Sequence, residues 1–526
     1  MPRARRSGLV KLAGSNLRPL AGARREPPPP SRKRVTLTIH LRSRENRRDL
    51  EALLPRIVAG KRPPLRRDEF KARFGAAKGD IARVRRFARA HGFRVGRVWI
   101  TERRLHLTGP ASALAEAFGV RRVVYTVDDL TFESRVGFVY VPKELADCVI
   151  GVYGFDHRPQ ALRAASAFDK SAAGFKPRVS YLPTRVGRLY DFPKQADGRG
   201  ETVGVIALGG GYLESDLRRF FRALRLKRPR YTAVSVDGAR NAPYGSAKAF
   251  DGEVTGDIET IGALAPGADV VVYFAPNTVR GFSDAVSRAV HDPAHRVSVL
   301  SISWGESEVR WTRHAIRAFN DVLLDAAVLG ITVCCSSGDH GALADPDDRL
   351  PHVCFPASSP YTLACGGTTL VAKGTRIVSE RAWSNRMGAS GGGVSEVFAL
   401  PPWQRTSRVP RARGGRRGRG VPDVASNGDP LTGFRIFGLG GWHVGAGTSA
   451  AAPVWAALVA RINQMRGRPL GLFTPFLYAH YHALLRDGAI RAITHGGNDR
   501  YRAHRGWNAC TGLGVPDGTK LAAALT

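Results

Sequence analysis

Cysteine is scarce in this chain, and the cysteines present form no metal or redox motif. Six cysteines are spread over 526 residues, and no two stand in a C-x-x-C pair. This spacing argues against a zinc site or a dithiol redox centre. Because the count is also low for a disulfide scaffold of this length, we expect small buried hydrophobic side chains in these positions.

Long apolar runs are missing as well. No stretch reaches the length of a membrane-spanning helix, so we expect no membrane span. Basic residues recur through the first thirty positions and leave no apolar core of signal-peptide length, so no signal peptide is visible. We predict that residues 1–33 form a disordered basic tail.

Acidic residues are outnumbered by basic ones. The chain holds 80 Lys and Arg against 44 Asp and Glu, a formal net charge of +36. Such an excess attracts nucleic acids and anionic membranes. However, the sequence contains no zinc-ligand spacing, no RNP-like aromatic motif and no helix-turn-helix pattern. We therefore expect a solvated basic surface without a specific nucleic-acid partner.

Residues 34–160 have the pattern of a small α+β domain. Strand-like runs alternate with helical ones, and Asp80 stands where it can cap a helix that ends near Gly92. Split β-α-β units of this kind form ferredoxin-like sandwiches. The following segment, 161–178, is rich in Ala, Ser and Lys without periodicity. It reads as a linker that is open to proteolysis.

Residues 179–526 have the pattern of an α/β domain. Buried-strand runs such as VGVIAL, ADVVVYFAP, VSVLSISW and ITVCCSS are separated by amphipathic segments. This alternation predicts a parallel sheet covered by helices on both faces. Catalytic groups are then expected on loops at the carboxyl ends of the strands.

The motif GTSAAAP, residues 447–453, points to a nucleophile. Ser449 stands between small residues at the start of a helical run, so its hydroxyl can meet a substrate carbonyl where the helix N-terminus adds positive potential. The alternative is that Ser449 only caps the helix. A nucleophilic serine also needs a base, and the HGT-like turn that carries the histidine of subtilisin-like enzymes is missing.

Two carboxylates offer another base. Glu253 and Asp257 are four residues apart and share one helix face. When two such groups are partly desolvated together, one pKa rises, which gives a base suited to acidic pH. The alternative is an ordinary solvated acidic face. Asp339 follows the run ITVCC in a glycine-flanked loop and, when protonated, can donate to an oxyanion; the alternative is a turn-forming aspartate.

Taken together, these motifs resemble the sedolisin/kumamolisin family of serine-carboxyl peptidases. The order and context of Glu253, Asp257, Asp339 and Ser449 match, and the blocks LRRDEFKARFGAAKGDIARVRRFARAHG, SYLPTRVGRLYDFP, SGGGVSEVF and VPDVASNGDPLTGF are also family-like. The resemblance covers nearly everything from residue 35 onward. It implies a subtilisin-like peptidase domain behind a pro-kumamolisin-type activation prodomain.

The resemblance also implies roles for these residues. Ser449, Glu253 and Asp257 would form the catalytic triad, and Asp339 would supply the oxyanion donor. The edge at Ser303, Trp304 and Gly305 would pair with an extended polypeptide substrate. The partners would be that substrate and the chain's own prodomain, which acts as an intramolecular inhibitor in a self-processing, monomeric zymogen. The family inference for location is secreted or extracellular.

Two positions depart from the family pattern. Ala207 stands where members often have a glutamate that supports the catalytic glutamate, so the resemblance implies a reduced support network around Glu253. In the C-terminal calcium loop, Ala492 and Asn508 replace the two usual aspartates, while His504 and Arg505 add bulk and charge. We therefore expect no cofactor and no tightly bound calcium, with Asp499 as the one carboxylate able to reach in.

Two rival functions remain open. One is a subtilisin-like peptidase that works near neutral pH through a histidine, against which the missing HGT turn argues. The other is a non-catalytic protein that holds anionic polymers on a peptidase fold, against which the intact set of four candidate residues argues. The leading interpretation is a serine endopeptidase that cuts unfolded polypeptide at acidic pH.

Overall fold

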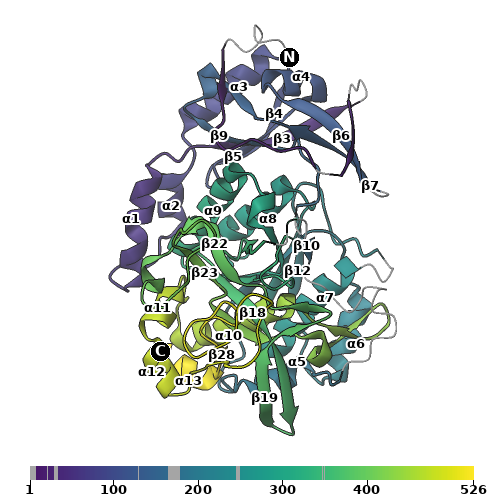
Figure 1. The fold of residues 1–526 in the computed structure, drawn as a ribbon. Coiled ribbons are helices and arrows are strands. Elements are labelled where there is room, and N and C mark those ends of the chain that lie inside the picture. Colours follow the sequence, from purple (N-terminus) through teal and green to yellow (C-terminus); the bar gives the residue numbers. More distant parts are fainter. Residues whose placement is uncertain are drawn as a thin grey trace.

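Two stacked units make up the chain in the computed structural model, with the smaller N-terminal unit resting on the larger one (Figure 1). The structure describes residues 8–20, 22–28, 33–127, 130–160, 162–163, 178–244, 249–345, 348 and 350–525. The predicted linker 161–178 lies outside the described residues except at positions 162, 163 and 178. The position of this domain boundary therefore stays a prediction.

A parallel sheet runs through the larger unit, as its apolar runs predicted. Neighbouring strands are parallel in the order β12–β13–β11–β14–β16–β18, with β24 also parallel to β18 and β19 antiparallel to it. The bounds are β11 Thr202–Ala207, β12 Tyr231–Ser235, β13 Asp269–Phe274, β14 Val299–Ile302, β16 Thr332–Ser336, β18 Leu363–Lys373, β19 Arg376–Ala382 and β24 Val424–Asn427.

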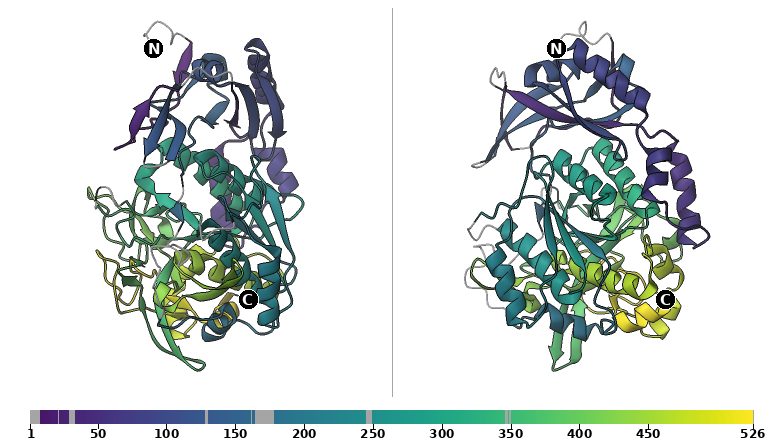
Figure 2. Two further views of the ribbon diagram at one scale, coloured as in Figure 1. Left: turned by 90° about the vertical axis from the view of Figure 1, so that its right-hand side faces the viewer. Right: turned by 180° about the vertical axis from the view of Figure 1, so that it is seen from behind.

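Helices cover both faces of this sheet, and alternate strand residues show which helix lies where. Val205 packs in one core with α7 (Ala249–Leu264) and α10 (Thr448–Arg466). The next residue, Ile206, packs in a second core with α8 (Val279–His291) and α9 (Arg313–Val328). The expected α/β architecture with helices on both faces is confirmed, and Figure 2 shows these layers from two further sides.

Shorter elements complete the larger unit around this three-layer frame. They are α5 Pro183–Leu189, α6 Glu214–Ala223, β15 Trp304–Ser307, β17 Cys354–Phe355, β22 Gly393–Ala399, β23 Gly418–Val421, β25 Phe434–Gly438, β26 Gly441–Gly445, α11 Thr474–Ala479, α12 Tyr481–Arg486 and α13 Gly518–Leu525.

The smaller unit is built on an antiparallel sheet in the order β4–β5–β3–β9. By chain position this order is second, third, first, fourth, which is compatible with the predicted ferredoxin-like sandwich. Two of its helices, α1 and α2, reach down and pack their leucines and phenylalanines against α9. The bounds are β3 Arg34–Leu41, α1 Arg47–Val58, α2 Arg67–Phe74, α3 Lys78–Ala90, β4 Arg94–Trp99, β5 Arg104–Pro110, α4 Ala111–Ala117 and β9 Val149–Tyr153.

The described part of the N-terminal tail is ordered, so the prediction of a disordered segment 1–33 is wrong there. β1 (Leu9–Lys11) pairs with β8 (Tyr140–Pro142), and β2 (Arg24–Glu26) pairs with β6 (Arg121–Val127), which also pairs with β7 (Leu130–Val136). The physical reason is that the edges of β8 and β6 offer backbone groups that need hydrogen-bond partners. Charge composition does not reveal such a pairing.

Asp80 does not cap its helix, contrary to the sequence prediction. α3 begins at Lys78 with Ala77 before it, so Asp80 lies inside the first turn. Its buried carboxylate accepts a hydrogen bond from Nε of Arg42 at 2.9 Å. The Asp80 side chain therefore forms a long-range ion pair with Arg42, whereas the local sequence pattern predicted that it caps the helix.

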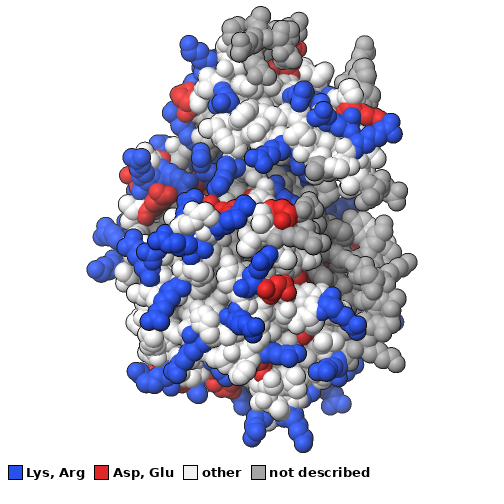
Figure 3. Space-filling view, in the orientation of Figure 1, with Lys and Arg blue, Asp and Glu red and all other residues white. Residues whose placement is uncertain are grey.

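The distribution of basic residues and cysteines agrees with the expectations from the composition. Lys and Arg are scattered over both units on the face shown in Figure 3. The six cysteines are buried and free, as expected of small hydrophobic side chains. Among the described residues, no helix is both long and apolar enough to cross a membrane.

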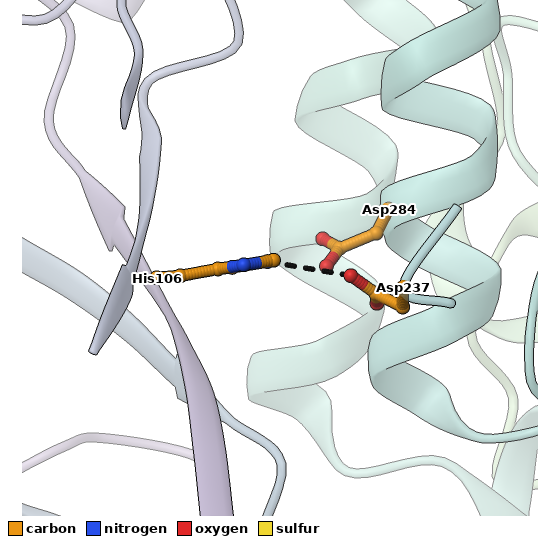
Figure 4. A group of neighbouring side chains, drawn as sticks. All are labelled: His106, Asp237 and Asp284. Atoms are coloured by element: carbon orange, nitrogen blue, oxygen red, sulfur yellow. Dashed lines mark ion pairs between the residues drawn. The ribbon is translucent and has the colours of Figure 1, made fainter. Parts of the chain in front are cut away.

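Buried ion pairs join the two units. Asp284 on α8 accepts from Thr38 at 2.8 Å and lies 3.0 Å from Nη1 of Arg104, both on the smaller unit. His106 lies 3.3 Å from Asp237 in the same cluster (Figure 4). A histidine beside two aspartates can suggest a metal site. Here Arg104 and Arg280 already neutralise the carboxylates, with Arg280 2.9 Å from Asp237, so we interpret the cluster as a structural ion-pair network.

His314 at the start of α9 is buried under the smaller unit in a setting that suits only its neutral form. Its Nε2 lies 2.8 Å from the carbonyl oxygen of Ile150, so this nitrogen carries the hydrogen. Nδ1 then accepts from the hydroxyl of Tyr153 at 3.1 Å. Burial lowers the pKa of His314 to about 4.

We predict that acid weakens the contact between the units through His314. A histidine with a depressed pKa contributes stability that is present above its ordinary pKa of about 6.5 and is lost as the pH falls towards 4. The loss amounts to at most about 3 kcal/mol. His314→Gln, which takes up no proton, should flatten the fall in the urea midpoint between pH 7 and 4. These measurements use a Ser449→Ala chain to prevent self-cleavage.

The control for this prediction is His482→Gln, which alters an exposed histidine of α12. It should follow the parent chain at every pH. A His314→Gln curve that coincides with the parent curve would contradict the assignment of the acid response to this imidazole.

Candidate active site

Ser449 lies in the first turn of α10, where glycine sets the entry of the chain. Gly447 precedes the helix with φ of +94°, a conformation that side-chain-bearing residues avoid. Ser449 is 4% exposed, and its Oγ donates to the carbonyl oxygen of Ser303 at 3.1 Å. The alternative of a plain helix cap is wrong, because the cap position belongs to Gly447 and Ser449 is already helical.

Glu253 and Asp257 lie one turn apart on α7, as the spacing predicted. They are 5% and 2% exposed, so the alternative of a solvated acidic face is also wrong. Burial raises the pKa of Asp257 well above its usual range, and the charge of Glu253 raises it further. The two carboxyl groups are therefore poised to hold one proton between them.

The two carboxylates and the serine line one small pocket. Its walls come from α7, from the hairpin β25–β26 and from the start of α10, and the full lining is Gly252, Glu253, Gly256, Asp257, Thr260, Phe434, Ile436, Gly445, Ala446, Ser449, Ala450 and Pro453. This lining contains no histidine among the described residues. The structure thus brings a serine together with two acids, without an imidazole base.

Asp339 follows β16 and reaches the site through Thr448, which sequence reasoning missed. Its Oδ1 accepts from the backbone N–H and from the hydroxyl of Thr448, both at 2.8 Å. The Thr448 hydroxyl in turn accepts from the N–H of Gly338 at 3.0 Å. Asp339 is thereby fixed next to the residue that precedes Ser449, although it is absent from the described lining of the pocket. In the sequence, the only indication that Thr448 belongs to the site was its position between Gly447 and Ser449.

The predicted substrate edge follows β14 directly. Trp304 is fully buried and donates from Nε1 to the carbonyl oxygen of Ile206 at 2.9 Å, so its side chain braces the sheet. The backbone of Trp304 and Gly305 pairs antiparallel with residues 162–163 of the chain's own linker. An extended segment thus already lies along this edge. Oγ of Ser303 lies 2.9 Å from Oδ1 of Asp257, so this side chain faces the carboxyl pair and does not serve as a side-chain contact for substrate.

A third acid of α7 and the glycine-rich turn help to hold the site, and the sequence did not single them out. Asp251 accepts from the N–H of Gly211 at 2.9 Å and from the N–H of Tyr244 at 2.8 Å. It therefore ties the turn after β11 to the start of α7. Ala207, at the end of β11, is fully buried and offers only a methyl group where a supporting carboxylate was considered.

Comparison with known proteins agrees with this geometry. Residues 21–158 match the family model of the pro-kumamolisin activation domain, and residues 245–492 match that of the subtilase family. Kumamolisin from Bacillus sp. (strain MN-32) is 43% identical, with 98% of this chain and 96% of that protein covered. Sedolisin from Pseudomonas sp. (strain 101) is 28% identical, with 88% and 81% covered.

A solved structure gives the same result. Pseudomonas sedolisin, determined with two molecules of pseudo-iodotyrostatin, superposes with a TM-score of 0.60 at 26% identity and covers 67% of this chain and 99% of its own. Fold and comparisons together define a serine-type peptidase with a subtilisin-like fold and an N-terminal activation prodomain. More specifically, the chain belongs to the kumamolisin–sedolisin family of serine-carboxyl peptidases.

The loop that corresponds to the family's calcium site is closed by Asn508. Its amide Nδ2 donates to the carbonyl oxygens of His504 at 3.0 Å and Gly512 at 3.4 Å. Its Oδ1 accepts from the N–H groups of Cys510 at 3.1 Å and Thr511 at 2.9 Å. These four contacts also fix which amide atom is which.

This donor set does not fit calcium, which takes six to eight oxygen ligands. Nδ2 of Asn508 already donates to the carbonyl oxygens of His504 and Gly512, and Ala492 adds no side-chain oxygen. The one nearby carboxylate, Asp499, is exposed, and one of its oxygens lies beside Gly341, on the loop after Asp339. We propose that the amide of Asn508 replaces the ion as the group that closes this loop.

We predict that chelation does not affect this enzyme. EDTA should leave the melting temperature and the peptidase activity unchanged, because hydrogen bonds hold the loop. Metal analysis after dialysis should find far less than one calcium per chain. Stoichiometric calcium, together with a melting temperature that falls on chelation, would contradict this prediction.

Asn508→Ala provides the matching test of the hydrogen bonds. It leaves the buried N–H groups of Cys510 and Thr511 and the carbonyl of His504 without their side-chain partner, while the Gly512 carbonyl keeps the backbone N–H of residue 508. The substitution should destabilise the chain by about 2–4 kcal/mol. A melting temperature equal to that of the parent chain would show that Asn508 does not hold the loop.

Proposed function

We propose that this peptidase is an acid-acting endopeptidase made as a self-processing zymogen. Ser449 attacks the substrate carbonyl, and Glu253 takes the serine proton and later returns it to the leaving amine. Asp257 orients Glu253 and shares its proton. Asp339 donates to the oxyanion. The observation that carries this proposal is the pocket that unites Ser449 with two buried carboxylates.

The choice of acidic pH rests on two opposite requirements. Glu253 must be ionised to accept a proton, whereas Asp339 must be protonated to donate a hydrogen bond to an oxyanion. Both conditions hold together only in an acidic range. A histidine base would need neutral pH, and the described lining of the pocket provides none. An acid peptidase that is blocked by a prodomain suits export, so we place its action outside the cell.

The substrate class follows from the edge at Ser303, Trp304 and Gly305. Backbone pairing accepts any extended polypeptide, because it reads main-chain groups and leaves selectivity to side-chain pockets. Support comes from the linker, whose residues 162–163 already pair with Trp304 and Gly305. The prodomain therefore blocks this edge with its own chain before processing.

We predict that Ser449→Ala and Glu253→Ala each remove nearly all activity, since nucleophile and base act as a unit. Asp257→Ala should also be severe. Asp339→Ala should lower kcat by roughly 10²–10³, the usual loss for one oxyanion donor. Casein digestion at pH 3–7 measures these effects. Turnover by Ser449→Ala close to that of the parent enzyme would rule out the assignment.

We predict that the acidified precursor cuts itself within residues 161–178, on the C-terminal side of Arg163. The reason is that residues 162–163 lie along the substrate edge and run towards Ser303, whose carbonyl oxygen accepts from Ser449. Mass spectrometry of the mature N-terminus identifies the cut, and the Ser449→Ala precursor serves as the uncut control. A mature chain that begins well beyond Leu182 would contradict this prediction.

A further inference from the structure

The backbone carbonyl of the nucleophile lacks its usual partner within the helix. In an α-helix, the carbonyl of residue i accepts from the N–H of residue i+4. For Ser449 that residue is Pro453, which has no N–H to donate. A side chain from outside the helix fills the gap, because Oγ of Ser303 lies 3.2 Å from the Ser449 carbonyl oxygen.

The Ser303 hydroxyl faces two oxygens but has only one hydrogen. Besides the Ser449 carbonyl, Oγ lies 2.9 Å from Oδ1 of Asp257. The Ser449 carbonyl and an ionised carboxylate can both only accept, so one hydrogen satisfies both contacts only if Ser303 donates to Ser449 and the carboxyl group is protonated. The contact between Ser303 and Asp257 is then a hydrogen bond only if the carboxyl group is the donor.

We infer that in the resting enzyme Asp257 carries a proton on Oδ1 and donates it to Ser303, whose own hydroxyl donates to the backbone of the nucleophile. Ser303 is thus a positioning residue that links the carboxyl pair to Ser449. This inference rests on the proposed function insofar as Glu253 and Asp257 are the catalytic pair. It leaves Glu253 as the ionised member that is ready to accept the serine proton.

The surroundings of Asp257 favour this placement of the proton. Ser303 is fully buried, and both of its contacts are to protein atoms. Oδ2 of Asp257 receives no hydrogen bond from the described residues. Burial, and then the charge of Glu253, raise the pKa of Asp257 well above its usual range, which keeps the carboxyl group neutral.

The alternative makes the opposite prediction for a simple variant. If Ser303 donated to an ionised Asp257, the hydroxyl would stabilise the charged form, and its removal would raise the pKa of Asp257. If Ser303 instead accepts from protonated Asp257, its removal takes support from the neutral form and lowers that pKa. The direction of the change therefore decides between the two arrangements.

The test is an infrared titration of the full-length chain carrying Ser449→Ala, which keeps the backbone carbonyl at position 449 and prevents self-cleavage. Subtraction of the spectrum of the same chain with Asp257→Asn isolates the C=O band of protonated Asp257. We expect Ser303→Ala to move the midpoint of this band down by about one pH unit, the worth of one hydrogen bond. A midpoint that rises or stays unchanged, or no band for Asp257 at all, would overturn the inference.

Pro453→Ala tests the same chain of hydrogen bonds without touching Ser303. The new N–H can serve the Ser449 carbonyl, which frees the Ser303 hydroxyl to donate to Asp257 and stabilise its ionised form. The midpoint of the Asp257 band should again fall. Ser301→Ala is the matched control, because Ser301 is fully buried on β14, two residues before Ser303, and its hydroxyl has no hydrogen-bond partner among the described residues. It should leave the band unchanged.

Measurements of kcat and KM distinguish a positioning role of the Ser303 side chain from a role in packing alone. The backbone of Ser303 belongs to the substrate edge and survives the substitution, whereas the side chain serves Asp257. Ser303→Ala should therefore lower kcat on the order of tenfold and leave KM within about twofold. An equal loss in Ser301→Ala would overturn the positioning role. The infrared result does not depend on turnover, so an inactive parent enzyme would refute the proposed function and leave the placement of the proton to be judged separately.

Discussion

The burial of two carboxyl groups on one face of α7 is the constraint on which the site depends. Glu253 and Asp257 line a pocket whose described lining contains no lysine, arginine or histidine. Two buried negative charges without a cation are too costly, so one of the groups must hold a proton. The other group then remains ionised, and a carboxylate of this kind is suited to act as a general base at acidic pH. In the function we propose, this arrangement also explains how Ser449 acts as a nucleophile in a pocket whose described lining holds no imidazole.

Another buried aspartate shows that burial alone does not decide this behaviour. Burial would raise the pKa of Asp284, but Arg104 reverses the effect and holds it well below the usual range. Among the residues that the structure describes, Asp257 has no such partner, and its pKa is raised. The presence or absence of cationic partners therefore separates a carboxylate that fastens the two units from a carboxyl group that can exchange a proton.

Much of the fold and the site was predictable from the sequence, because the relevant patterns are local. Apolar runs located the central strands, and the four-residue spacing placed Glu253 and Asp257 on one face. The contacts that were missed join distant segments. Arg42 is 38 residues from Asp80, and Thr448 is 109 residues from Asp339. The periodicity of the sequence gives no information on such long-range pairings. Likewise, net charge does not show that the basic N-terminal tail adds strands to the edges of sheets.

The zymogen combines two contacts that depend on each other. While the linker is intact, residues 162–163 meet Trp304 and Gly305 at the high effective concentration of one chain, so the edge stays covered. After a cut in the linker, the prodomain is held only by the surface between the units. That surface contains His314, and the packing around this side chain requires its neutral form. Because the pKa of His314 is about 4, acid protonates it and weakens the contact. In the function we propose, cleavage removes the tether and acid weakens the remaining contact, so the acidic pH that suits the carboxyl pair also favours release of the prodomain.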